Sequence, residues 1–433
     1  MKWPWLGVAS LSLTCARPGP LPLARAESSS PPTARSPAPA RSTRPAPTRT
    51  LSPAPPVSVA AVCRSGSLST FFDALTELRS GTRHEHVRVL WLGDSHTNAD
   101  FMSGRVRSAL ADRFGDGGPG FVRIGSKAYR HEGVKYTRDG RWNLDPDPPA
   151  RRSRQNDGVF GLGGTRAEPG PDARFSVQAS APGAAASSLA RFELCYAMPP
   201  GASFRVELGS QKLLIDALCP AEVTPSGLAH LTLRAPLGSE LVIHSARGSP
   251  RLFDVSIERS ETAGVVLDVA GIDGARLETP LAWDEAAFAE EVARRDPSLV
   301  VIAYGTNEAF DALRVEKYGP QLESLVQRVR RGAPRASCLV LGPTDAPLGE
   351  GSVPRVAQVT AVLREQSARL GCSFASLQQL MGGEGSFARG MRAKERLAQA
   401  DRLHLTPKGY RELGQALASS LLDAYSAGRA DLP

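Results

Sequence analysis

The chain has 433 residues, 41% of them hydrophobic, so it can bury at least one large core and is not a bare small domain. Its formal net charge is +8, but the first 56 residues hold seven Lys or Arg side chains against Glu27 alone and so carry +6 of that charge. Only +2 remains for the folded part, which argues against a basic nucleic-acid-binding face there.

Residues 1–26 are predicted to be a secretory signal. Lys2 precedes a short apolar stretch, and Ala24 and Ala26 offer a cleavage site. The stretch is too short to span a bilayer, and no later segment reaches the roughly 20 apolar residues that a span needs. A lipid anchor on Cys15 is disfavoured, because Ser12-Leu13-Thr14 is a poor approach to such a cysteine. We expect export to the periplasm, the envelope or the medium; the alternative is a disordered cytoplasmic leader.

Residues 27–60 are predicted to form a disordered linker. They are rich in Pro, Ala, Ser, Thr and Arg, and such a segment cannot bury enough apolar surface to offset its ordering entropy. The cationic segment is either a solvated linker or a tether that lies against an anionic envelope.

Apolar runs alternate with helical patterns in the outer parts of the folded region. Asp284 and Thr406 are candidate N-caps, Thr406 is followed by Pro407 at the first helical position, and Gly371 ends a helix predicted over 355–370. Another helix is expected around 322–329. Because β-strands alternate with these helices, we predict a doubly wound three-layer α/β/α sandwich. Its buried parallel strands are expected at 87–92, 265–269, 299–304, 338–341 and 372–376.

The stretch between 135 and 262 lacks a helical period. Short alternating runs separated by Gly and Pro predict a β-sandwich inserted into the α/β domain, with strands at 173–178, 190–196, 203–208, 230–234, 240–244 and 251–257. The α/β domain would then comprise 61–134 and 263–433. Residues 130–154, with Trp142 and many charges, are predicted to be a surface loop at the junction.

Six cysteines are present, and none lies in the close pairs of a zinc ribbon, so no metal site is expected. If Cys15 leaves with the signal, Cys63 stays unpaired. The other four cysteines are either two disulfides, Cys195–Cys219 and Cys338–Cys372, or isolated buried thiols.

A serine, a histidine and an aspartate form the candidate catalytic centre. Ser95 directly follows the predicted strand 87–92, at the carboxyl end of the sheet where open α/β folds place ligands. A serine hydroxyl needs a base to remove its proton, and His404 is the candidate base. Asp401, three residues earlier, can hold the imidazole in one tautomer. This set predicts a serine esterase.

Acyl transfer also requires donors for the oxyanion of the tetrahedral intermediate. Gly274 follows the strand at 265–269 and exposes its amide without a side chain in the way. Asn307 follows the strand at 299–304 and offers a side-chain amide. With the backbone amide of Ser95 at a helix start, these residues predict an oxyanion hole built from three strand ends.

Gly93-Asp94-Ser95, the Gly274 loop, Gly305-Thr306-Asn307-Glu308 and Asp401-x-x-His404 occur in the block order of the SGNH (GDSL-type) hydrolases, which this chain resembles over about residues 83–130 and 264–425. The resemblance implies a flavodoxin-like fold, Ser95, His404 and Asp401 as the triad, Ser95, Gly274 and Asn307 as the oxyanion hole, and no metal or organic cofactor.

More narrowly, the β-insertion after the first block and the continuation of the motifs into Ala275-Arg276 and Ala309 resemble bacterial peptidoglycan O-acetylesterases, whose inserted module is similar to carbohydrate-binding folds. One position departs from that pattern. Asp273 stands where a polar amide is expected before Gly274, and a carboxylate beside an oxyanion is unfavourable unless it points away.

Four further residues support the site. Asp94 is predicted to be a structural turn carboxylate rather than a second base, and Glu308 to brace the Asn307 loop. His96 either contacts substrate or packs beside the strand end. Arg276 either recognises a sugar or anion or forms a salt bridge, which we favour. The aromatic residues of the insertion are predicted to fill its core rather than form a sugar platform: Phe192, Tyr196, Phe204 and Phe253.

The sequence therefore predicts an exported, monomeric esterase that removes O-acetyl groups from a carbohydrate polymer, with acetylated peptidoglycan as the favoured substrate. Two rivals stay open. One is an O-acetyltransferase that uses the same residues on an envelope glycan, and the other is a non-catalytic envelope-binding protein on the same fold. No nucleic-acid partner is expected.

Overall fold

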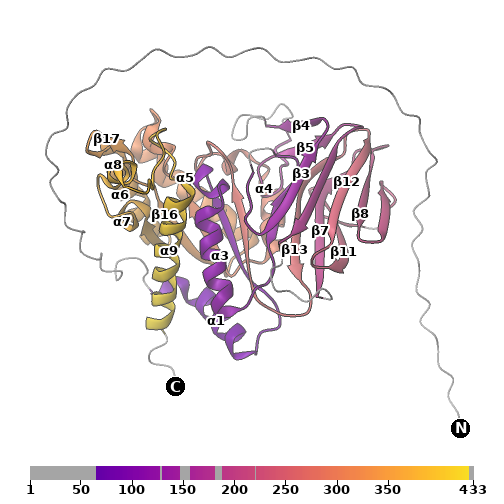
Figure 1. The fold of residues 1–433 in the computed structure, drawn as a ribbon, viewed down its shortest axis with the longest axis horizontal. Coiled ribbons are helices and arrows are strands. Elements are labelled where there is room, and N and C mark those ends of the chain that lie inside the picture. Colours follow the sequence, from indigo (N-terminus) through magenta and orange to yellow (C-terminus); the bar gives the residue numbers. More distant parts are fainter. Residues whose placement is uncertain (1–64, 127–128, 147–156, 181–187, 220, 429–433) are drawn as a thin grey trace, which may run out of the picture. The chain divides into compact units, whose positions relative to one another are not determined.

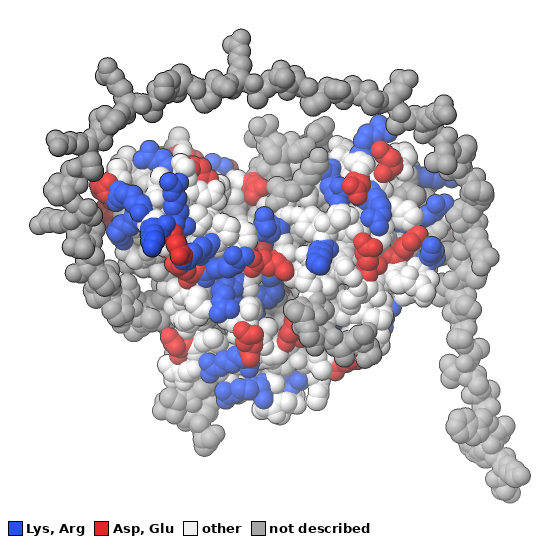
Figure 2. All heavy atoms as spheres, in the orientation of Figure 1, with Lys and Arg blue, Asp and Glu red and all other residues white. Residues whose placement is uncertain are grey.

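The computed structural model describes residues 65–126, 129–146, 157–180, 188–219 and 221–428 (Figure 1). The predicted signal, the linker, Cys15 and Cys63 lie outside the described residues. Within them, no helix has the length and apolar character needed to cross a bilayer. On the face drawn in Figure 2, acidic and basic side chains are interspersed.

A five-stranded parallel sheet forms the centre of the α/β part. Its strand order is β14-β1-β15-β16-β19, which is the flavodoxin-like 2-1-3-4-5 order. The strands are β1 (Val87–Gly93), β14 (Val265–Gly271), β15 (Leu299–Ala303), β16 (Ser337–Gly342) and β19 (Ser373–Ser376). The order reverses between β1 and β15, which places the expected ligand crevice at the carboxyl ends of these two strands.

Helices cover both faces of this sheet, because alternate residues of each strand point to opposite sides. Val89 and Trp91 of β1 pack in the core shared with α1, α3 and α9, whereas Leu90 and Leu92 pack in the core shared with α4, α5 and α6. The α/β/α prediction is therefore confirmed. The helices are α1 (Ser69–Ser80), α2 (Ser95–Asn98), α3 (Phe101–Phe114), α4 (Glu285–Arg295), α5 (Tyr318–Gly332), α6 (Pro354–Arg369), α7 (Leu377–Leu380), α8 (Ser386–Arg392) and α9 (Pro407–Ala427).

Two antiparallel sheets form the β-module, and a common apolar core lies between them. One has the order β10-β11-β7-β13-β5-β4, with β2 also paired to β13; the other has the order β3-β6-β12-β8-β9. The strands are β2 (Gly120–Arg123), β3 (Val134–Asp139), β4 (Trp142–Asp145), β5 (Arg166–Pro169), β6 (Arg174–Ala179), β7 (Leu189–Ala197), β8 (Ser203–Leu208), β9 (Gln211–Ile215), β10 (Glu222–Val223), β11 (Ala229–Pro236), β12 (Glu240–Arg247) and β13 (Arg251–Arg259). A small hairpin in the α/β part joins β17 (Pro347–Leu348) to β18 (Gly351–Ser352).

The predicted surface loop at 130–154 is wrong for its described part. Residues 134–139 form β3 and residues 142–145 form β4, each paired in a different sheet of the module. Trp142 packs against the core of the sandwich. Alternate side chains of these edge strands face solvent, which explains the charged composition that suggested a loop.

The two candidate disulfides, which the sequence left open against isolated thiols, have different outcomes. Cys338 of β16 is bonded to Cys372, as predicted. The Cys195–Cys219 disulfide is wrong: the Cys195 thiol lies 3.6 Å from a carboxylate oxygen of Glu291, and the Cys219 thiol donates to the carbonyl of Leu214 at 2.9 Å. The two cysteines face different surroundings because Cys195 points out of the sandwich core, toward α4.

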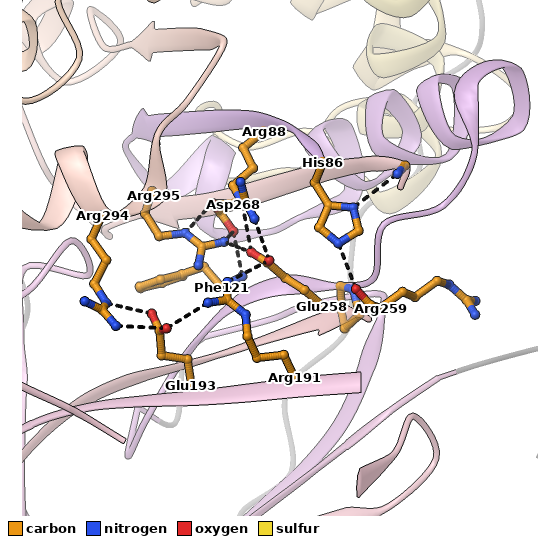
Figure 3. Close-up of polar contacts among 12 residues, drawn as sticks. His86, Arg88, Phe121, Arg191, Glu193, Glu258, Arg259, Asp268, Arg294 and Arg295 are labelled. Atoms are coloured by element: carbon orange, nitrogen blue, oxygen red, sulfur yellow. Dashed lines mark hydrogen bonds and ion pairs between the residues drawn. The ribbon is translucent and has the colours of Figure 1, made fainter. Parts of the chain in front are cut away.

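Buried ion pairs join the parallel sheet to the β-module (Figure 3). Arg295 at the end of α4 donates to both carboxylate oxygens of Asp268 on β14, at 2.8 and 2.9 Å, and to Glu258 on β13 at 2.5 Å. Arg88 of β1 also pairs with Glu258, at 2.9 Å. Burial alone would raise the pKa of Glu258, but these two guanidinium groups and that of Arg191, at 2.9 Å, outweigh it and hold this pKa far below its usual range.

Candidate active site

Ser95 lies at the start of α2, directly after β1 and its turn residue Asp94. Asp94 is the N-cap, and its carboxylate accepts a hydrogen bond from the backbone N–H of His96 at 2.9 Å. Asp94 is buried, which raises the pKa of its carboxyl group. These contacts agree with a structural role for Asp94 in the turn that presents Ser95.

Three side chains from the two ends of the fold meet in one hydrogen-bonded chain. The hydroxyl oxygen of Ser95 lies 2.9 Å from Nε2 of His404, and Nδ1 of His404 lies 2.8 Å from Oδ2 of Asp401. Ser95 is 309 residues from His404 in the sequence, so only the fold brings them together. The candidate nucleophile, base and acid predicted from the sequence are therefore adjacent.

The loop before α9 holds Asp401 in place. Oδ1 of Asp401 accepts the backbone N–H groups of Leu403 and His404, each at 3.0 Å, which leaves Oδ2 for the imidazole. Arg402 has a φ of 64°, in the left-handed region, and this tight turn lets the chain fold back on Asp401. Partial burial tends to raise the pKa of Asp401, but these hydrogen bonds outweigh it and lower the pKa. Asp401 is thus an anion at neutral pH.

His96 packs beside the end of β1, which is one of the two roles that the sequence left open for it. It is 3% exposed, its Nδ1 lies 2.8 Å from the hydroxyl of Tyr410, and its ring centre lies 5.4 Å from that of His404. Burial, together with the neighbouring His404, lowers the pKa of His96 to about 3, although Asp401 opposes this shift. His96 is therefore neutral and adds no charge beside the imidazole of His404.

The three predicted oxyanion donors lie on loops at the carboxyl ends of three neighbouring strands. Ser95 begins a helix, where the first N–H groups have no intrahelical acceptor. Gly274 has a φ of 75° and open space on the side where a Cβ would project. Asn307 donates one of its two amide hydrogens to the carbonyl of Ala275 at 2.9 Å, so the Asn307 loop is tied to the Gly274 loop.

Close backbone approach sets the position of the Gly274 loop against α2. A Cβ on Gly271 would lie 2.2 Å from the backbone nitrogen of Asn98, so only glycine fits at the end of β14. Asn98 also holds the carboxylate of Asp273, donating to its Oδ1 at 2.8 Å. Asp273, which departs from the family pattern, is therefore stabilised by a hydrogen bond from the α2 residue Asn98.

Arg276 forms the salt bridge that we favoured over a ligand contact. Its Nε lies 3.3 Å from Oδ2 of Asp311, and its Nη1 donates to the carbonyl of Gly274 at 3.3 Å. Arg276 thus holds the backbone of the Gly274 loop through the carbonyl group of Gly274.

Glu308 braces the two loops that carry the oxyanion donors. It is fully buried, and its two carboxylate oxygens accept the N–H groups of Leu277 and Gly305 at 2.8 and 2.9 Å. Burial raises the pKa of Glu308 to about 7, although these two N–H donors oppose the shift.

We expect Glu308 to make the protein less stable as the pH rises. The folded protein keeps a proton on this carboxyl group up to about pH 7, whereas the unfolded chain releases it near pH 4.5, so protonation favours the folded state. Below pH 4.5 this proton stabilises the folded state in full. The stabilisation, about 3 kcal/mol in all, is lost as the pH rises through 7. Urea denaturation of wild type and Glu308→Gln across this range measures it. An identical pH dependence in both proteins would contradict the prediction.

Sequence reasoning missed three residues that shape the site. Tyr410 orients His96, Asn98 anchors Asp273, and Arg123 of β2 donates to the carbonyl of Gly271. Asn98 lies one helical turn after Ser95, which is the one signal that could have drawn attention to it. Tyr410 and Arg123 reach the site only through tertiary packing.

The fold and the site define a class. A flavodoxin-like sheet that presents a serine after its first strand and an Asp-x-x-His pair before its last helix is the arrangement of an SGNH-type serine hydrolase acting on carboxylic esters. The model of the GDSL-like lipase/acylhydrolase family matches residues 238–412. Over this range the chain is similar to this family.

One solved structure is similar to this chain over nearly the whole folded part. A structure titled peptidoglycan O-acetylesterase matches with 26% identity and a TM-score of 0.70, over 85% of this chain and 99% of its own. An acetylxylan esterase from Geobacillus stearothermophilus matches with 18% identity and a TM-score of 0.29, over 37% of this chain and 73% of its own. No curated protein matches the sequence.

Proposed function

We propose that the protein is an exported carbohydrate O-acetylesterase that acts through Ser95, His404 and Asp401. The observation that carries the proposal is the continuous contact from the Ser95 hydroxyl through both imidazole nitrogens of His404 to the Asp401 carboxylate, at 2.9 and 2.8 Å. This arrangement activates a hydroxyl that would otherwise be a weak nucleophile.

The proposed reaction has two steps. His404 Nε2 takes the proton of Ser95 while the serine oxygen attacks the carbonyl carbon of the ester, and the amides of Ser95, Gly274 and Asn307 stabilise the oxyanion. His404 then gives the proton to the departing sugar oxygen, leaving an acyl-serine. Water, deprotonated by His404, attacks this acyl group and releases acetate and free Ser95. Asp401 holds the Nδ1–H tautomer and stabilises the imidazolium in both steps.

The structural similarity supports the proposed substrate class. The peptidoglycan O-acetylesterase structure aligns over both the α/β part and the β-module, at 85% of this chain, so we favour O-acetylated peptidoglycan as the substrate. The predicted signal at 1–26 would deliver the enzyme to the compartment that holds this polymer.

Acetate release from a panel of polymers tests the substrate. We expect wild type to release acetate from O-acetylated peptidoglycan faster than from acetylated xylan, and Ser95→Ala to release none. Hydrolysis of 4-nitrophenyl acetate without acetate release from any glycan would reject the carbohydrate assignment. Transfer of acetyl groups to a glycan acceptor in preference to water would identify an O-acetyltransferase.

Replacing Asn307 with alanine tests the oxyanion hole. We expect kcat to fall by about 10²–10³-fold, because one donor to the developing charge is lost. Asn143→Ala is the matched control, since Asn143 is an exposed amide that bonds Glu168 in the β-module. Hydrolysis of 4-nitrophenyl acetate measures both variants. Equal rates for Asn307→Ala and wild type would remove Asn307 from the proposed hole.

A further inference from the structure

Three polar residues lie side by side on adjacent strands of the β-module. His230 on β11 is opposite Cys195 on β7, and Asp254 on β13 is opposite the same cysteine. Directly opposite residues of antiparallel strands point to the same face of a sheet. Because Phe192, Leu194 and Tyr196 of β7 point into the sandwich core, this row lies on the other face.

Helix α4 of the α/β part covers this row and adds a carboxylate. Nε2 of His230 lies 2.9 Å from Oε1 of Glu291, and the thiol of Cys195 lies 3.6 Å from Oε2 of the same residue. The ligand atoms of Cys195, His230 and Glu291 all lie within 4.8 Å of one another. All three residues are at most 3% exposed.

The polar atoms of this cluster are poorly satisfied. Nε2 of His230, Oε1 of Glu291 and Oδ2 of Asp254 have no hydrogen-bond partner among the described residues, since the 2.9 Å approach of the first two is not aligned as a hydrogen bond. Leaving a buried polar atom unpaired costs about 1–3 kcal/mol. Two of these atoms, Nε2 of His230 and Oε1 of Glu291, lie 2.9 Å apart, which points to a missing partner that both face.

The spacing of these atoms fits a metal ion. Zinc binds nitrogen or oxygen at about 2.0–2.1 Å and thiolate sulfur at about 2.3 Å, so tetrahedral ligands lie about 3.3 Å apart for an N–O pair and about 3.6 Å for an S–O pair. The observed separations are 2.9 and 3.6 Å. Thiolate, imidazole and carboxylate together are ligands that zinc takes, whereas Mg²⁺ and Ca²⁺ prefer oxygen alone.

We propose that Cys195, His230 and Glu291 bind a structural Zn²⁺ ion between the β-module and α4. The site was not expected from the sequence, since its ligands are far apart along the chain. The proposed metal site does not include any residue of the proposed triad, so we assign the ion a structural role.

The charges of the cluster agree with a divalent cation. Burial, together with the adjacent Glu291, raises the pKa of the Cys195 thiol, and burial with Glu291 also raises the pKa of Asp254. A metal ion reverses such shifts, because it stabilises the thiolate and carboxylate forms. Binding would release the thiol proton, and one thiolate with one carboxylate would neutralise Zn²⁺ in the buried site.

A carboxylate also faces the second nitrogen of His230. Nδ1 lies 4.0 Å from Oε1 of Glu193. Glu193 is itself held by Arg294 at 2.9 Å and by Arg191 at 3.0 Å (Figure 3). At 4.0 Å this carboxylate makes no hydrogen bond to the ring, but its negative charge favours a cation bound at Nε2. The ion-pair network of the junction thus supports the proposed ligand set.

Metal content of the full-length chain, prepared without a polyhistidine tag, tests the proposal. After dialysis against Zn²⁺ and then metal-free buffer, we expect one zinc per chain in wild type and in Cys219→Ser, the matched thiol of the same module. We expect none in Cys195→Ser and His230→Ala. A free Zn²⁺ concentration of about 100 times the dissociation constant should raise the Tm of wild type by about 3–4 °C. The Tm of Cys195→Ser should not change.

Substitution of Co²⁺ for Zn²⁺ tests the thiolate ligand without the ligand variants, and so can be used if those variants do not fold. Wild type and Cys219→Ser loaded with Co²⁺ alone should show the near-ultraviolet absorption of a thiolate–cobalt bond. Wild type that retains no zinc, or cobalt-loaded wild type without this absorption, would overturn the proposal and leave a buried His230–Glu291 ion pair. Zinc bound equally by wild type and folded Cys195→Ser would overturn it as well.

Discussion

Replacing Ser95 with alanine is expected to lower kcat/KM for 4-nitrophenyl acetate by about 10⁴-fold or more, because the hydroxyl that lies 2.9 Å from Nε2 of His404 is lost. The substitution removes one oxygen atom at the start of α2 and leaves the cap made by Asp94 in place. Thermal unfolding of the variant should therefore match wild type.

Ser80→Ala is the matched control, since Ser80 is an exposed serine at the end of α1. It should keep the wild-type rate. Activity of Ser95→Ala near that of wild type would rule out Ser95 as the nucleophile, whatever the geometry at His404.

Replacing Arg295 with methionine is expected to lower the free energy of unfolding by about 3–5 kcal/mol, because Asp268 and Glu258 then lose a buried partner. Asp268 is fully buried and Glu258 is 1% exposed, so water cannot take the place of the guanidinium group. Urea denaturation at neutral pH measures the loss.

Arg369→Met is the control for this prediction. Arg369 pairs with Glu365 on the exposed side of α6, and such a surface pair contributes about 0.5 kcal/mol or less. If Arg295→Met lowered the free energy of unfolding no more than this control does, the stability of the junction would not depend on the buried ion pairs.

The parallel sheet was predictable because each strand is buried on both faces and therefore appears as an unbroken apolar run. The predicted strand 87–92 is observed as Val87–Gly93, and 338–341 as Ser337–Gly342. Helix starts were equally clear, since Asp284 and Thr406 cap α4 and α9 with their side chains as predicted. These signals are local in the sequence, and no tertiary contact overrides them.

The edges of the sandwich and its outer face were not predictable. The strands β3 and β4 carry charges on their exposed sides and so resemble a loop, and β2 joins the module from before the predicted boundary at 135. The partner of Cys195 depends on how α4 docks on the sheet, which no local pattern reveals.

For the site, sequence motifs indicated Ser95, Gly274, Asn307, Asp401 and His404, and the structure brings these residues to one edge of the sheet. Their catalytic roles stay predictions until the variants are measured. The contacts of Tyr410 with His96 and of Asn98 with Asp273 could not be foreseen, because each depends on a distance across the fold.

The order of the chemical groups along the chain has a consequence for biosynthesis. The proposed nucleophile precedes its base by 309 residues, and the base is held by the turn that leads into α9, the last described helix, which packs against α3. A nascent or clipped polypeptide that ends before this turn would carry Ser95 without any means of activating it. Ester cleavage would then begin only after synthesis has passed residue 404 and α9 has packed against α3. Incomplete chains would therefore not hydrolyse esters.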